Sequence, residues 1–468
     1  MTLMMKLVSI VKASSLLLLH GCKCSGHYDY DAEREMMTAT TAAIDGFRSR
    51  MQTAFNGVFS MQNESFAMWI ALSHPEFGDF YFVFGNSTSS SLGQQPPDIP
   101  ATLDDFFQIG SISKTFLGTA MLLMEEQGQL SLNDTVGSLV PDFAGQFPQY
   151  ANYTVENLLR MDTLVGDFLN DAGGILNNYT KDDSMRYSPE EIVAYAVRDG
   201  YYPRDVPEYS TTNFIVGEVI VEHVTGKLIQ EVVQELIFEP LNLTSMQLPN
   251  RYSDGVLPEP AATPYLGSAC LGEFTMFGVD GLTLNQDITE FSQGIVMAGT
   301  GGAINTNIHD LLAWAKSGTG DALLTDDAVA RRHRHLGTGF AGYGIAQYEF
   351  RDMVAQILGE DDRTGWRGHA GDAFGYSAYA FHNDDLGASF AGAVNSCSAD
   401  IPTLYQSLTI LIEELKAWNN SSESTTGANS TTPSSGGPVL QSSVAAPILG
   451  AYVSVLLKTA ILLIGILW

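Results

Sequence analysis

The chain has 468 residues, of which 45% are hydrophobic and 10% aromatic, so it can bury a large core in one composite domain or two. Its formal net charge of −30 excludes the basic surface that nucleic-acid binding requires. The one cationic cluster, residues 331–335, is short, and we expect it to be a solvated loop. No grouping of His or Cys has the spacing of metal ligands, so neither a metal nor a cofactor is expected.

The first segment has the pattern of a secretory signal. Residues 1–24 carry Lys6 and Lys12 around an apolar run that ends in four leucines, and small and polar residues follow. Residues 19–22 are also similar to a bacterial lipoprotein cleavage box, although His20 fits that box poorly. We therefore expect an exported protein whose folded domain spans residues 25–418.

Helical and strand patterns follow in alternation. A helix is expected at 31–55 and strands at 66–72 and 80–84. The middle of the chain is mainly helical, with helices expected at 154–161, 189–198, 213–237 and 307–316. Strand patterns return at 343–350, 376–382 and 388–394, and a last helix is expected at 403–418. Strands at both ends that enclose a helical middle predict an α/β (α+β) fold, with one sheet built from both ends of the chain and a helical domain inserted.

A candidate nucleophile lies at the start of one strongly apolar helix. A strand-like run ends at Gly110, and from Ser111 to a stop at Gly128 the sequence is that of a helix that is apolar on nearly all sides, hence buried. Lys114 follows three residues after Ser111, so its side chain returns over the same face. A lysine in an apolar wall loses its charge easily and can then take a proton from a serine hydroxyl. A helix-capping serine followed by a surface lysine would give the same spacing.

Two further stretches carry reactive side chains. Tyr209 stands just before an amphipathic helix, where its hydroxyl could enter a cleft and relay a proton, although an aromatic residue at a helix start is more often a packing residue. His369 lies among glycines beside a strand, where a substrate backbone could come close and the following N–H groups could hold an oxyanion. A histidine taken alone is more often structural.

The last part of the chain has the composition of a linker and a membrane anchor. Residues 419–444 are rich in Ser, Thr and Gly, and residues 445–468 are apolar apart from Lys458. This arrangement fits a glycolipid-anchor (GPI) signal or a single transmembrane helix, and the sequence does not separate the two. The expected location is the extracellular face of a membrane.

Glycosylation triplets and cysteines agree with export. Nine asparagines stand in such triplets: Asn63, Asn86, Asn133, Asn152, Asn178, Asn242, Asn419, Asn420 and Asn429. If Cys22 and Cys24 leave with the signal, Cys270 and Cys397 remain, either as a disulfide or as two separate buried thiols.

Three ordered motifs resemble the serine β-lactamase and penicillin-binding-protein superfamily, and most closely its class C-like branch with D-alanyl-D-alanine peptidases and esterases. The motifs are Ser111-x-x-Lys114, Tyr209 to Phe214 with Gly217 in the next helix, and His369-x-Gly371. The resemblance covers residues 106–394 and implies an antiparallel sheet flanked by helices with an inserted helical domain. It also implies a serine hydrolase that acts through an acyl-enzyme on small esters, amides or peptides. A β-lactamase or D-Ala-D-Ala peptidase, and a cell-surface binding protein that has lost turnover, are the alternatives.

The resemblance also implies roles for single residues. Ser111 would be the nucleophile, Lys114 its base or proton relay, and Tyr209 the phenol that passes protons to the leaving group. His369 stands where relatives have Lys or His. The backbone N–H groups of Ser111 and Asp372 would form the oxyanion hole.

The chain departs from the family pattern at three places. Thr211 stands where relatives have an asparagine, so the side-chain amide that would bind a substrate amide is missing. Thr211 and Gly371 are the expected substrate contacts. Residues 160–163 replace a His-x-Ser-Gly run, and Asp372 puts a carboxylate beside the oxyanion site unless its side chain points away. Because His369 and Thr211 hold an anionic amide less well, we expect small neutral or cationic esters and amides to be better substrates than penicillins.

Overall fold

The computed structural model describes residues 30–61, 66–88, 98–170, 175, 186–198, 202–268, 270–271, 281–334, 343–350, 365–397 and 403–426. The expected secretory signal, the apolar tail and most of the linker lie outside these residues.

The described strands form one antiparallel sheet in the order β3-β2-β1-β9-β8-β7-β6 and one small two-stranded sheet, β4-β5. Strand β1 pairs with β9, which joins the first described strand to the last one described and confirms the prediction of one sheet built from both ends. The bounds are β1 Ala67–His74, β2 Gly78–Thr88, β3 Ile99–Pro100, β4 Phe107–Gln108, β5 Asn305–Thr306, β6 Tyr348–Glu349, β7 Trp366–Ala373, β8 Tyr376–Asn383 and β9 Ala388–Val394.

Most of the described helices lie between β2 and β6. The α-helices are α2 Tyr30–Ser60, α3 Ser113–Glu126, α4 Val136–Leu139, α5 Pro141–Gln146, α6 Val155–Leu159, α8 Pro189–Ala196, α9 Thr212–Thr225, α10 Ile229–Val233, α12 Thr289–Ser292, α13 Ile308–Lys316, α14 Asp326–His333 and α16 Tyr405–Thr426. Tighter or wider turns are η1 Gly110–Ile112, η2 Phe168–Asn170, η3 Gln234–Phe238, η4 Gln293–Gly301 and η5 Asp321–Leu323.

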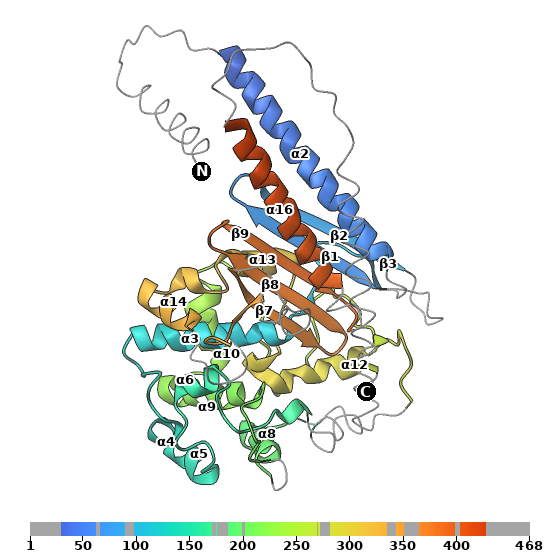
Figure 1. Ribbon diagram of the computed structural model, residues 1–468. Coiled ribbons are helices and arrows are strands. Elements are labelled where there is room, and N and C mark those ends of the chain that lie inside the picture. The colour runs from blue at the N-terminus through green and yellow to red at the C-terminus, as the bar shows by residue number, and fades with distance from the viewer. Residues whose placement is uncertain are drawn as a thin grey trace.

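The two faces of the large sheet carry different layers (Figure 1). On one face lie α2 and α16, because Phe47, Met51 and Phe55 form a stripe with four-residue spacing along α2 that packs with the apolar side of α16. On the other face lie α3, α13 and the inserted helices, which share a second core with Trp69. Strand β1 is covered on both sides, so it reads as a continuous apolar run.

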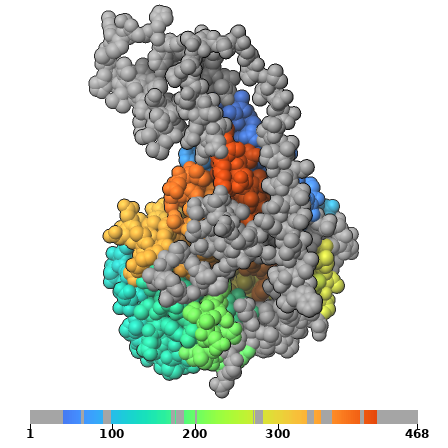
Figure 2. All heavy atoms as spheres, viewed as in Figure 1, coloured from blue at the N-terminus to red at the C-terminus, as the bar shows by residue number. Residues whose placement is uncertain are grey.

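The inserted helices form one end of the molecule. In Figure 2 the residues from about α3 to α9 gather there, away from α2 and α16 at the opposite end. Helix α9 approaches α3 closely because it has glycine at the contact: a Cβ on Gly217 would lie 2.7 Å from Leu117 Cδ2. This contact brings the start of α9, and with it Tyr209, beside the start of α3.

Several element boundaries differ from the sequence-based expectation. The helix expected at 213–237 is broken after α9, because Gly226 takes φ 67° and ends that helix in the left-handed conformation. Of the strand expected at 343–350, the two residues of β6 pair with β7. Helix α16 continues past residue 418 to Thr426, into the segment expected to be linker.

The cationic cluster is not a solvated loop, so that expectation is wrong. Its first three residues end helix α14, and Arg332 is fully buried. Arg332 is hydrogen-bonded to Asp321 and Thr119, each at 3.1 Å, and Arg331 pairs with Glu125 and Glu156. Glu125 and Glu156, which neutralise Arg331, lie 206 and 175 residues away along the chain, so the sequence around the cluster could not reveal these pairs.

Cys270 and Cys397 form a disulfide, with their Cα atoms 5.8 Å apart. Within the described part of the chain, no helix combines the length and the apolar character needed to cross a membrane.

Candidate active site

Ser111 lies in the turn η1 between strand β4 and helix α3, partly exposed to solvent. Helix α3 is buried along nearly its whole length and ends before Gly128, which has φ 71°, as the sequence predicts. Lys114 is fully buried, so the pair is not a capping serine followed by a surface lysine. The predicted strand–turn–helix around the serine is confirmed, with the refinement that a short 3₁₀ turn precedes the α-helix.

Lys114 Nζ lies 2.9 Å from Ser111 Oγ, which is hydrogen-bond distance. A second hydrogen bond runs from Nζ to the carbonyl of Gly301 in the turn η4. The same nitrogen lies 4.9 Å from the ring centroid of Tyr209 and 5.5 Å from that of Phe214. Lys114 is therefore fixed by two hydrogen bonds and two aromatic rings, in reach of the serine proton.

Burial lowers the pKa of Lys114 from its ordinary value to about 7, while the nearby carboxylate of Asp167 opposes this shift. A lysine with such a pKa is uncharged in a large fraction of molecules near neutral pH. It can then accept the proton of Ser111 as the serine attacks a carbonyl carbon.

Tyr209 is hydrogen-bonded to Ser111 through its side chain. Burial raises the pKa of Tyr209 well above the ordinary 10, and the bond to Ser111 offsets part of that rise. The phenol therefore keeps its proton at neutral pH and is a proton donor. Of the two groups beside the serine, Lys114 is suited to be the base and Tyr209 the acid.

His369 lies in β7 with its ring buried between two partners. Its Nδ1 donates to the carbonyl of Ala370, which leaves Nε2 to accept from Tyr343 Oη at 2.8 Å. Burial and, to a smaller extent, the charge of Lys114 lower the pKa of His369 to about 3, so the ring is neutral. His369 therefore offers no positive charge to a substrate, and its free nitrogen is taken by Tyr343.

The backbone of β7 lies directly against the serine turn. A Cβ on Gly371 would lie 1.9 Å from the carbonyl oxygen of Ile109 and 2.8 Å from Ser111 N, and a Cβ on Gly110 would meet the backbone of Asp372. Glycine is required at both positions because a side chain at either one would push the turn η1 and strand β7 apart. The contact brings the backbones of Ser111 and Asp372 together. That their N–H groups form an oxyanion hole remains a prediction.

The carboxylate of Asp372 is directed away from His369. Side chains alternate along a strand, so Asp372 lies on the opposite face of β7 from His369 and Gly371. Its Oδ1 accepts a hydrogen bond of 2.7 Å from Ser377 Oγ in β8. The side chain of Asp372 thus points away from His369, although its charge is still close enough to add to the rise that burial causes in the pKa of Tyr209 and of Tyr348.

Thr211 is buried, and its hydroxyl donates to Asp167 Oδ2 at 2.9 Å, so this hydroxyl holds the neighbouring loop. The substrate-binding role of Thr211 remains a prediction.

The structure adds two residues that the sequence did not point to, Asp167 and Tyr343. Asp167, itself buried, is the charge that acts on Lys114, and Tyr343 is the partner of His369. An acidic residue inside an otherwise apolar run, residues 164–169, was the available indication for Asp167.

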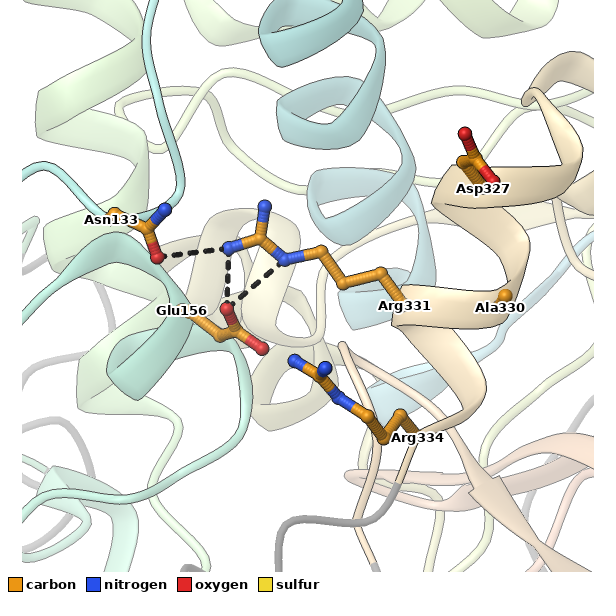
Figure 3. A pocket seen from close by; sticks show the side chains of 6 residues that line it. All are labelled: Asn133, Glu156, Asp327, Ala330, Arg331 and Arg334. Carbon is orange, nitrogen blue, oxygen red and sulfur yellow. Dashed lines mark hydrogen bonds and ion pairs between the residues drawn. The ribbon is translucent and has the colours of Figure 1, made fainter.

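A separate surface hollow of about 470 Å³ lies at the end of α14 (Figure 3), lined by Asn133, Glu156, Asp327, Ala330, Arg331 and Arg334. Arg331 is already neutralised there: Figure 3 shows its guanidinium directed at Glu156 and Asn133. None of the predicted site residues lines this hollow. Within the described ranges, no three or more His, Cys, Asp or Glu side chains cluster in a way that could hold a metal ion.

A partly exposed serine, a buried lysine in hydrogen-bond contact with it and a protonated tyrosine lie together on an antiparallel sheet with an inserted helical domain. This is the arrangement expected of the β-lactamase and penicillin-binding-protein superfamily. The chain belongs to the beta-lactamase family, whose model matches residues 85–399.

Known relatives agree with this assignment. Over 173 residues the chain is 29% identical to penicillin-binding protein 4 of Amycolatopsis lactamdurans, a match that covers 36% of this chain and 43% of that protein. The chain spans less than half the length of the curated relatives it matches.

Solved structures show the same fold at low identity. D-amino acid amidase from Ochrobactrum anthropi SV3, complexed with L-phenylalanine amide, superposes with a TM-score of 0.63 at 18% identity, covering 80% of this chain and 99% of that chain. A D-stereospecific amidohydrolase from Streptomyces sp. superposes with a TM-score of 0.59 at 20% identity, covering 76% and 97%. The predicted family and fold class are both confirmed.

Proposed function

We propose that this protein hydrolyses small esters or amides through an acyl-enzyme on Ser111. The observation that carries the proposal is the 2.9 Å contact between Ser111 Oγ and the Nζ of a fully buried lysine. In the first half-reaction Lys114 takes the proton of Ser111, Oγ bonds to the substrate carbonyl carbon, and the leaving group departs with a proton supplied through Tyr209. In the second, water attacks the ester and Ser111 regains its proton, which releases the acid.

Small neutral or cationic substrates fit this site better than penicillins. A penicillin carries a carboxylate, and His369 is neutral with its acceptor nitrogen bonded to Tyr343. The hydroxyl of Thr211 is occupied by Asp167. The names of the structurally similar amidases support amides as one substrate class.

A fluorophosphonate probe tests the mechanism. We expect labelling at Ser111, and we expect Ser111→Ala and Lys114→Ala each to remove nearly all activity on a p-nitrophenyl ester, with a double variant little worse because both act in one proton transfer. Tyr209→Phe should cost on the order of a hundredfold. A folded, unlabelled protein without esterase activity would instead show a binding protein that keeps the fold.

We further propose that the protein is exported and tethered to the outer face of a membrane by its apolar tail. The apolar first segment and the Cys270–Cys397 disulfide support export, and Asn133, Asn152 and Asn242 are exposed acceptors for glycosylation. A phospholipase that cuts glycolipid anchors should release the protein from cells if the tail is an anchor signal. Retention, with peptides from residues 451–468 still present, would show a membrane-spanning tail, and a cytosolic protein would refute the proposal.

A further inference from the structure

Helix α9 carries a buried carboxylate that the catalytic assignment leaves unused. Glu218 is 1% exposed and lies one turn after Phe214, with its Oε2 against Nη2 of Arg251, a residue that is itself 8% exposed. The other guanidinium nitrogen, Nη1, donates to the carbonyl of Met297 at 3.1 Å. A buried ion pair is weak evidence for stability, because two apolar residues of the same size often serve the core as well. The pair therefore invites a search for what it holds in place.

The second oxygen of Glu218 holds the turn η4. Oε1 accepts from the backbone N–H of Thr300 and, at 2.7 Å, from its hydroxyl. Gly299, directly before, has φ 50° and ψ −133°, and a Cβ there would lie 2.1 Å from Glu218 Oε1. The carboxylate thus occupies the space where a side chain at position 299 would stand.

The same turn presents the carbonyl that binds Lys114. The carbonyl of Gly299 accepts from the N–H groups of Gly302 and Ala303, at 3.1 and 2.7 Å, which closes the turn around Gly301. On its other side Gly301 abuts Thr211, since a Cβ on Gly301 would lie 2.5 Å from Thr211 Cγ2. Between these two contacts the carbonyl of Gly301 is directed at Lys114 Nζ.

We infer that Glu218, paired with Arg251, is a positioning residue for Lys114, acting through Thr300 and the carbonyl of Gly301. A lysine side chain has several rotatable bonds, so the alignment of Lys114 Nζ with Ser111 depends on the groups that hold it. The bond to Gly301 selects that alignment, and Glu218 fixes Gly301. This inference rests on the proposed role of Lys114 as the base.

The test compares kcat and KM of matched variants on one p-nitrophenyl ester. Glu218→Gln keeps the size of the side chain but removes the charge that binds Arg251, and a misplacement of Lys114 on the order of 1 Å should lower kcat by about a hundredfold while KM stays within about twofold. Thr300→Val removes one hydrogen bond at constant volume and should lower kcat by about threefold to tenfold.

Glu156→Gln is the matched control, because Glu156 also pairs with a buried arginine, Arg160, at 2.7 Å, but has no link to Lys114. It should lower the melting temperature as Glu218→Gln does while leaving kcat within about twofold.

The outcomes separate this inference from the function beneath it. A folded Glu218→Gln with normal kcat, beside inactive Ser111→Ala and Lys114→Ala, would refute the positioning role and leave the hydrolase standing. Full activity in Ser111→Ala would refute the hydrolase mechanism itself. If Glu218→Gln does not fold, Thr300→Val decides, and an unchanged kcat there overturns the inference.

Discussion

Lys114 sets the pH dependence expected of the reaction. Its folded pKa, about 7, lies below the ordinary lysine value, so the uncharged form that can accept a proton is lost as the pH falls through 7. We expect kcat/KM on a non-ionising ester to level off above about pH 8 and to fall about tenfold for each pH unit below 6. His369, with a pKa of about 3, stays neutral across this range, so it adds no second inflection to the pH–rate profile.

A pH–rate profile of the wild-type protein checks this, with thermal melts at each pH to show that the fold persists. A profile that is flat between pH 5 and 9 would mean that Lys114 is not the base. Lys114→Arg provides the comparison, because a guanidinium keeps its proton at every pH in the range and should leave almost no activity.

At the scale of residues, sequence reasoning identified the candidate reactive groups that the structure brings together, but not the groups that hold them in place. Ser111, Lys114 and Tyr209 belong to short ordered motifs, so their order along the chain pointed to one site. Asp167 and Tyr343 reach that site from segments with no such spacing. Their contacts depend on how loops fold over the sheet, which local patterns do not encode.

At the scale of elements, strands and helices were predicted best where the pattern was long. The apolar helix after Ser111 and strands β8 and β9 agree with expectation because burial leaves a continuous apolar run. The strand expected at 343–350 is much shorter in the structure, where Tyr348 and Glu349 pair with β7. The aromatic residues at its two ends have other contacts: Tyr343 is hydrogen-bonded to His369, and Phe350 packs beside Tyr379.

The close contact between η1 and β7 gives a prediction about two elements. In Gly371→Ala the new methyl group would have to share space with the carbonyl of Ile109, so the turn that carries Ser111 must move. We expect a loss of activity of at least about a hundredfold in a protein that still folds. Steady-state kinetics and circular dichroism on the same preparation measure both.

Gly145→Ala is the control for this substitution. Gly145 is exposed in helix α5, and a Cβ there meets nothing within 4 Å. Its activity should be unchanged and its stability higher by about 0.5–1 kcal/mol, as alanine favours a helix over glycine. An equally active Gly371→Ala would show that η1 and β7 need not touch for catalysis.

At the scale of the whole molecule, the disulfide joins two positions 127 residues apart, Cys270 and Cys397, the second of which follows the end of β9. Closing so long a loop restricts the unfolded chain, and we expect its removal in Cys270→Ala with Cys397→Ala to lower the free energy of unfolding by about 2–5 kcal/mol. Melts with and without a reductant measure the effect, and the double variant should be insensitive to the reductant. A wild-type melting temperature that is the same in both conditions would contradict this.

The net charge of −30 gives the second whole-molecule prediction. A negative molecule concentrates cationic substrates around itself and repels anionic ones, and added salt screens both effects as the Debye length shrinks from about 30 Å at 0.01 M to about 3 Å at 1 M. We therefore expect kcat/KM for a cationic ester to fall by up to about tenfold across that range, and that of an anionic ester to rise.

A neutral ester of the same acyl group is the internal control, because its kcat/KM should not change with salt beyond what the chemistry itself shows. The three substrates are compared on one preparation, so that any effect of salt on folding divides out. If the cationic ester follows the neutral one at every salt concentration, the acidic residues lie too far from the cleft to act on a substrate. Substrate preference would then come from contacts in the site alone, with His369 neutral and Asp372 turned to the far face of β7.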